Sequence, residues 1–171
     1  MRKLSCEERK YIHSILHSPS IKEEGAILFN KLLEDLFVNE NNNVRMAFST
    51  DKNWVGFSVD GDKPEFQSKL INLIVFINLI RELNENGYLI VVESAAKGDF
   101  SNGAPYRHSA NLSLSLSTFL LSNFNSLLVV TDKLRELHEN NYKSIEEVRH
   151  SQAMDLAFIA IMVSILIAIF A

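Results

Sequence analysis

The sequence predicts an α+β fold, with a compact ααββαββα head in which antiparallel hairpins pack on helices, followed by one C-terminal transmembrane helix. Three observations lead to this expectation. The spacing of apolar residues switches along the chain between steps of three or four, typical of helices, and the alternation typical of strands. Serine-led capping boxes mark several helix starts. The last sixteen residues carry no charge.

The 171 residues are expected to form three parts. Residues 1–139 make a cytosolic α+β domain, residues 140–155 a helical juxtamembrane connector, and residues 156–171 a transmembrane tail anchor. The part that precedes the anchor is long enough to bury one hydrophobic core.

Two helices are expected at the start of the chain. Capping boxes, in which a serine is followed three residues later by a glutamate, begin at Ser5 and Ser20. The helices are expected over residues 6–17 and 21–37, and Pro19 separates them.

A hairpin and a long helix follow. Residues 44–49 and 54–59 alternate as strands do, and the polar tetrapeptide Thr-Asp-Lys-Asn joins them. Pro64 suits the first turn of a helix, and Gly87 suits the position just after a helix end. We therefore expect a helix over residues 64–86, and its apolar run LINLIVFINLI makes it the central helix of the core.

The rest of the head is expected to add a second hairpin and a helix. Residues 88–93 are predicted to pair with residues 111–117, where leucine and serine alternate strictly. A helix is expected over residues 118–139, broken at Asn140. Another capping box at Ser144 predicts a helix that runs straight into the anchor.

The C-terminal segment 156–171 reads LAFIAIMVSILIAIFA and is apolar on all sides apart from Ser164. At about 1.5 Å per residue it spans about 24 Å, slightly less than the hydrocarbon core of a bilayer. Basic residues precede it and none follow, which favours a single-pass topology with the N-terminal domain in the cytoplasm. The lipid bilayer is therefore an expected partner.

Small side chains recur along this tail at steps of three and four. On a helix they form one stripe, and such stripes let two helices pack closely in lipid. We therefore expect a homo-oligomer. The stripe consists of Ala157, Ala160, Ser164, Ala168 and Ala171.

Composition excludes several classes of function. The net charge is −4 and basic residues are scattered, which argues against nucleic acid as a partner. Cys6 is the only cysteine, so neither an intrachain disulfide nor a thiolate zinc cluster is expected. The N-terminal residues lack the apolar segment of a secretory signal, which agrees with a cytosolic head.

One stretch resembles a known family. Ile80 is followed by Arg-Glu-Leu-Asn-Glu-Asn-Gly-Tyr-Leu-Ile-Val-Val-Glu, which resembles the end of a winged-helix recognition helix and the wing after it. The resemblance covers Phe66 to Ser117. It implies a hairpin that contacts DNA or, as in other members of that family, another protein.

A candidate ligand site follows the third predicted strand. Residues 94–105 are rich in glycine, alanine, serine and asparagine, and basic side chains lie in and after them. Basic groups beside flexible glycine can hold a phosphate or another small anion. The candidate ligand-binding residues are Lys97, Arg107 and His108.

Other chemistry is not expected. His13 and His17 lie one helical turn apart, a spacing that can hold a metal, but no third ligand is identifiable, so we expect no metal and no cofactor. No serine stands in a nucleophile elbow, so we expect no enzyme. Trp54, the only tryptophan, is expected in the core or at its rim rather than as a stacking platform for bases.

The function expected from these features is non-enzymatic. The head of a tail-anchored membrane protein would bind a protein partner or a small anionic signal ligand, and would cluster or signal at the membrane. Two alternatives stay open. One is an oligomerising membrane-disrupting effector, for example in anti-phage defence, and the other is a membrane-tethered winged-helix-like DNA-binding regulator.

Overall fold

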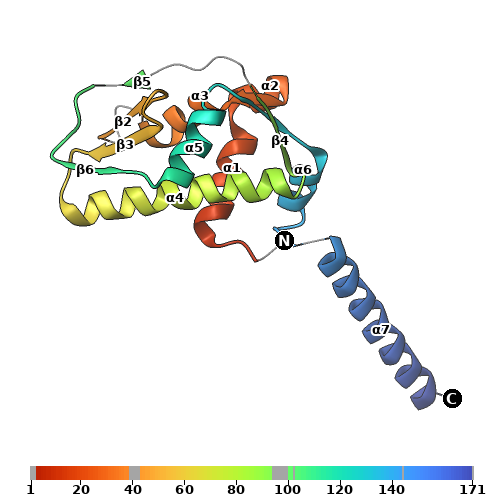
Figure 1. Ribbon diagram of the computed structural model, residues 1–171. Helices are drawn as coiled ribbons and strands as arrows, with labels where there is room; N and C mark the ends of the chain where they lie inside the picture. The colour runs from red at the N-terminus through yellow and green to blue at the C-terminus, as the bar shows by residue number, and fades with distance from the viewer. Residues whose placement is uncertain (1–2, 39–42, 94–99, 102, 144, 171) are drawn as a thin grey trace.

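The computed structural model describes residues 3–38, 43–93, 100–101, 103–143 and 145–170, and within the last of these ranges the side chains of residues 147–159 only. Figure 1 shows an α+β domain, as the sequence predicts, from which one long helix projects. In chain order the elements are α1 (Cys6–His17), α2 (Pro19–Glu24), β1 (Ala26–Leu28), α3 (Phe29–Leu33), the π-helical turn η1 (Glu34–Val38), β2 (Val44–Ser49), β3 (Trp54–Val59), α4 (Lys63–Glu85), β4 (Leu89–Val92), β5 (Phe100–Ser101), β6 (His108–Asn111), α5 (Leu114–Asn123), β7 (Leu127–Val130), α6 (Asp132–Glu139) and α7 (Ile145–Phe170).

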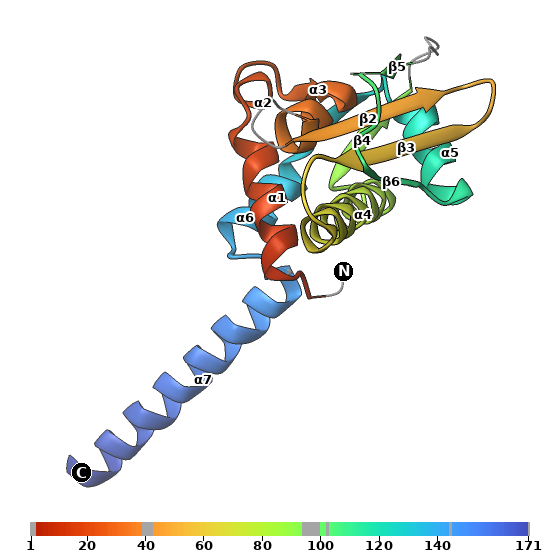
Figure 2. The same ribbon diagram turned by 90° about the vertical axis from the view of Figure 1, so that its left-hand side faces the viewer.

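The described strands form two antiparallel sheets. One sheet has four strands in the order β5-β2-β3-β6, and the other has three in the order β1-β7-β4. The predicted hairpin is confirmed, with strand β2 paired to β3 from Val44 opposite Val59 to Ser49 opposite Trp54. Its alternating pattern places Met46 and Phe57 on the buried face of the sheet. Figure 2 shows α4 beside this sheet.

Helix α4 is the central helix of the core, as its apolar sequence predicts. Its fully buried side chains include Phe76, which lies at the meeting point of several aromatic rings. The Phe76 ring contacts the rings of Tyr11, Phe29 and Phe37, at centroid distances of 5.3, 6.3 and 5.3 Å. Three N-terminal elements are thereby packed on one side chain of the central helix.

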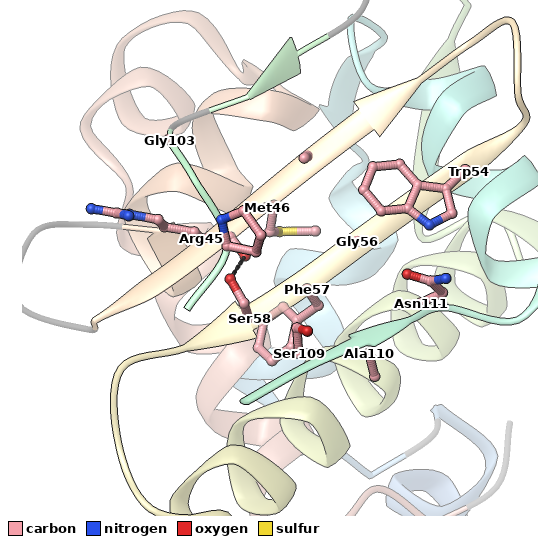
Figure 3. A pocket seen from close by; sticks show the side chains of 12 residues that line it. Arg45, Met46, Trp54, Gly56, Phe57, Ser58, Gly103, Ser109, Ala110 and Asn111 are labelled. Carbon is pink, nitrogen blue, oxygen red and sulfur yellow. Dashed lines mark hydrogen bonds between the residues drawn. The ribbon is translucent and has the colours of Figure 1, made fainter. Parts of the chain in front are cut away.

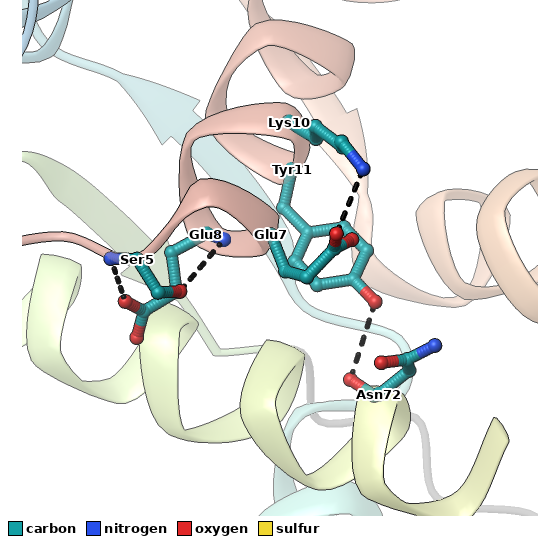
Figure 4. A network of polar contacts seen from close by, with 6 residues as sticks. All are labelled: Ser5, Glu7, Glu8, Lys10, Tyr11 and Asn72. Carbon is teal, nitrogen blue, oxygen red and sulfur yellow. Dashed lines mark hydrogen bonds and ion pairs between the residues drawn. The ribbon is translucent and has the colours of Figure 1, made fainter. Parts of the chain in front are cut away.

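The predicted first helix and its capping box are confirmed. The Ser5 hydroxyl accepts a hydrogen bond from the Glu8 backbone N–H at 3.2 Å, and the Glu8 carboxylate accepts one from the Ser5 N–H at 2.8 Å (Figure 4). One turn further on, the Tyr11 hydroxyl donates to the Asn72 carbonyl of α4 at 3.4 Å. These bonds fix where α1 begins and how it docks on the central helix.

The predicted helix over residues 21–37 is wrong. Gly25 adopts a left-handed conformation with φ +72°, which ends α2 after six residues. The next three residues form β1, because β7 offers them a strand partner. The expected capping box at Ser20 does not form either, since Ser18 is the residue that precedes α2.

The predicted strand over residues 111–117 and the helix over 118–139 are also wrong. Strand β6 ends at Asn111 and α5 begins at Leu114, so the alternating leucines and serines are mostly helical. Strand β7 interrupts the second half of the predicted helix and pairs with both β1 and β4. The expected partner of β4 is therefore replaced by a strand from further along the chain.

The predicted C-terminal transmembrane helix over residues 156–171 is contradicted. Across the part of the chain that the structure describes, no helix combines the length and the apolar character needed to cross a membrane. The first turns of α7 carry the charged side chains Glu147, Arg149 and Asp155. The predictions that depend on this helix, namely a tail anchor, a single-pass topology and a membrane localisation, are therefore wrong.

Tyr11 gives the stability of the fold a pH dependence. Burial, with a smaller effect of the nearby Glu7 carboxylate, raises the pKa of Tyr11 from 10.0 to about 12. The folded state therefore favours the neutral phenol. The contribution of this group to stability is complete below about pH 10 and is lost as the pH rises toward about 12.

We expect the free energy of unfolding, measured by urea denaturation, to fall more steeply with alkaline pH in the wild-type chain than in a Tyr11→Phe variant. Phenylalanine keeps the ring contacts but has no proton to lose. Equal slopes in the two proteins would contradict the assignment.

Candidate functional site

The face of the four-stranded sheet that points away from the core, here called the outer face, is hollowed. Residues opposite each other in antiparallel strands project to the same side. The register therefore places Ser58 and Ser109 beside Arg45 in one row, and Gly56 beside Ala47 in the next. Small side chains in both rows leave a depression in the middle of the sheet.

The ring of Trp54 forms one wall of this depression. It lies across Gly56, as Figure 3 shows, and a Cβ added at Gly56 would stand 2.6 Å from Cζ2 and 2.7 Å from Cη2 of the indole. Real Cβ atoms do not come so close, so only glycine leaves room for the ring. Trp54 is thus held against the outer face, with part of its surface open to solvent.

The segment after β5 forms the opposite wall. Arg45 Nη1 donates a hydrogen bond to the Ala104 carbonyl at 2.6 Å, and the guanidinium carbon lies 4.1 Å from the centre of the Tyr106 ring. These contacts place Gly103 and Pro105 at the edge of the depression. In Figure 3 the Arg45 side chain extends away from Trp54, so the positive charge lies at the far rim.

The two walls enclose a cavity of about 120 Å³, here called the sheet pocket. It is smaller than the pockets of about 300–1,000 Å³ that hold drug-sized molecules. The Asn111 side chain lies on the Trp54 side of the sheet pocket (Figure 3). Within the described residues, the side chains of Asn111 and Ser109 have no hydrogen-bond partner. Ser58 donates a hydrogen bond of 3.5 Å to the Arg45 carbonyl.

The two predicted ligand-binding residues that the structure describes, Arg107 and His108, do not lie in the sheet pocket. Lys97 lies outside the described residues. Arg107 is exposed and does not line the sheet pocket. His108 lies opposite Val59 on the other face of the sheet, with its ring 6.3 Å from that of Phe66.

Sequence reasoning identified part of the region but not its chemistry. Gly103 and Pro105 belong to the predicted loop and do line the sheet pocket. Arg45, Trp54 and Asn111 were missed as site residues. A glycine two positions after a tryptophan on a predicted strand is the signal that could have indicated a ring lying flat on the sheet.

The predicted packing stripe of the C-terminal helix falls mostly outside the described side chains. Ala157 is exposed on α7, and the side chains of Ala160, Ser164, Ala168 and Ala171 lie outside the described part of the chain. Their packing against a second copy stays untested.

Two of the three basic residues of α4, Lys69 and Arg81, have partners. Lys69 forms an ion pair of 2.8 Å with Glu65, and the Arg81 guanidinium carbon lies 5.7 Å from the centre of the Phe119 ring. The winged-helix resemblance itself stays a prediction.

No metal centre is already assembled in the described part of the chain. Among those residues, no group of three or more histidine, cysteine, aspartate or glutamate side chains is arranged to hold a metal ion.

A Gly56→Ala substitution is expected to displace the Trp54 ring. The added methyl group occupies the space of the indole, and overpacking of this kind costs about 1–3 kcal/mol. Because Trp54 is the only tryptophan, its fluorescence emission should shift to longer wavelength as the ring moves into water.

The matched control is Gly61→Ala in the turn after β3, where an added Cβ meets only the end of the flexible Glu65 side chain. This variant should keep the wild-type emission spectrum. An unchanged spectrum and unchanged stability in Gly56→Ala would show that Trp54 does not lie on the glycine.

In comparisons with known proteins, no family model, no curated protein and no solved structure matches this chain.

Proposed function

We propose that this chain is a binding protein whose sheet pocket takes a small planar ligand that carries an anionic group. The proposal rests on the Trp54 indole, which lies across Gly56 at the edge of a small, mainly apolar cavity whose lining includes the polar side chains of Ser109 and Asn111. An aromatic ring held in one orientation offers a surface for stacking another ring.

The sheet pocket fits such a ligand in size, and its mainly apolar lining includes a few polar side chains. A volume of about 120 Å³ suits one small ring rather than a peptide or an extended molecule. The Asn111 amide and the Ser109 hydroxyl can donate and accept hydrogen bonds along the edge of that ring. These groups provide orientation, while Trp54 provides contact area.

Arg45 supports the anionic group. Its guanidinium stands at the rim opposite Trp54 and has five N–H donors, of which one donates to Ala104. A carboxylate or phosphate attached to the stacked ring would reach this rim, where charge-assisted hydrogen bonds are stronger than neutral ones. The Tyr106 ring already holds the guanidinium in place.

The lining of the sheet pocket favours binding over catalysis. Among the described residues that line it, none is histidine, aspartate, glutamate, cysteine or lysine. General acid–base catalysis usually depends on one of these side chains. The protein would therefore act as a sensor or carrier of the ligand and would catalyse no reaction.

The test uses the fluorescence of Trp54 during titration of the full chain. The compounds are purine and pyrimidine nucleoside monophosphates, the matching nucleosides, and benzoate. We expect a saturable change with at least one compound that combines a ring and an anion. Gly56→Ala should abolish the change, because the ring that the ligand stacks on has moved.

An Arg45→Gln variant should bind the anionic compound about 10-fold or more weakly, and should bind its uncharged counterpart as the wild-type chain does. The control is Lys52→Gln, which removes an exposed positive charge near Trp54 in sequence but outside the sheet pocket. The proposal fails if no compound changes the fluorescence, or if both arginine and lysine variants lose affinity equally.

A further inference from the structure

Three of the five histidines meet where the first and the sixth helix lie together. His13 and His17 stand one turn apart on α1, and His138 is in the last turn of α6. The ring centres of His13 and His17 are 3.9 Å apart, and those of His13 and His138 are 5.4 Å apart. These three residues are here called the histidine cluster, and all three are open to solvent at least in part.

Two nitrogen atoms in the histidine cluster already stand at the separation of two metal ligands. His13 Nδ1 and His138 Nε2 are 3.2 Å apart. For a tetrahedral zinc ion with Zn–N bonds of about 2.0–2.1 Å, two ligand nitrogens are about 3.3 Å apart. A metal ion could take the place of the proton that the two nitrogens share, with only a tilt of the rings.

In the third ring, that of His17, the nitrogen that bonds to its own helix is Nδ1 and not Nε2. His17 Nδ1 lies 2.9 Å from the His13 carbonyl oxygen, and because a carbonyl can only accept, Nδ1 carries the proton and donates. In the neutral ring the lone pair is then on Nε2. Nε2 is therefore the nitrogen of His17 that is available to bind an ion.

The surroundings keep the histidine cluster in place and favour the neutral form of the His138 ring. The Tyr142 hydroxyl, just after α6, donates to the Arg9 carbonyl of α1 at 3.0 Å, and Leu134 and Leu137 anchor α6 in the core. Burial, together with the neighbouring His13 and His17, lowers the pKa of His138. Neutral imidazole is the form that binds metal ions.

We propose that His13, His17 and His138 form a binding site for a divalent transition-metal ion such as Zn²⁺, which joins α1 to α6. Imidazole nitrogen suits zinc, copper and nickel, whereas calcium and magnesium prefer oxygen ligands. Two nitrogens are in position. The three side chains do not converge on one point, so the His17 ring must turn and give up its bond to the His13 carbonyl to bring Nε2 to the ion. Water fills the remaining coordination position. This site is separate from the sheet pocket and does not depend on its ligand.

The test is isothermal titration of zinc chloride into the metal-free full chain, with a thermal melt of each protein before and after zinc addition. The wild-type chain should bind one zinc ion per molecule and melt at a higher temperature with zinc than without it. Substitutions His13→Ala, His17→Ala and His138→Ala should each weaken zinc binding by about 10-fold or more. A His138→Gln variant keeps a hydrogen-bonding group between the helices and should lose zinc binding while its metal-free melting temperature is retained.

The matched controls are the two histidines outside the histidine cluster, His108 on β6 and His150 on α7. Their alanine variants should bind zinc as the wild-type chain does. The proposal is overturned if the wild-type chain takes up no zinc, if any of the three alanine variants binds it with unchanged affinity, or if the control variants lose it equally.

Discussion

The packing of aromatic rings around Phe76 is the interaction on which the rest of the structure depends. Tyr11 of α1, Phe29 of α3 and Phe37 of η1 all meet this one side chain of α4. Phe29 also contacts Phe119 of α5, which extends the cluster to the later part of the chain. The first third of the chain, although broken into short elements, is thereby held on the long central helix. Each such aromatic contact contributes about 0.5–1.5 kcal/mol beyond the burial of its area.

That arrangement decides which face of each element is free for chemistry. With α4 on one side of the four-stranded sheet, the residues that alternate away from it must form the outer face, and their register alone places Arg45, Ser58 and Ser109 in one row. The same logic applies to α1. Its buried side packs on the core, so His13 and His17 are left on the side that meets α6. Core packing therefore decides where the sheet pocket and the histidine cluster lie. Each is completed by a segment that is distant in the sequence.

Local signals predicted those elements whose boundaries are written in neighbouring residues. The capping box at Ser5, the polar turn between β2 and β3, and Gly87 after α4 are signals of this kind, and the elements beside them agree with the structure to within a residue or two. Strands β1 and β7 could not be found in this way, because their conformation depends on pairing across about 100 residues of chain. The sites share this limit. Neither the approach of Arg45 to Tyr106 nor that of His138 to His13 has a signature in local spacing.

The order of strands in the three-stranded sheet has a consequence for how the protein is made. Strand β7 is the middle strand, yet it comes last in the chain, after both of its neighbours. While the chain is being synthesised, β1 and β4 therefore emerge from the ribosome without a partner, and their apolar side chains Leu28, Ile90 and Val92 have no sheet to join. The three-stranded sheet can close only when Val130 has emerged, so this sheet forms late, whereas every strand of the four-stranded sheet has been made once Asn111 has emerged.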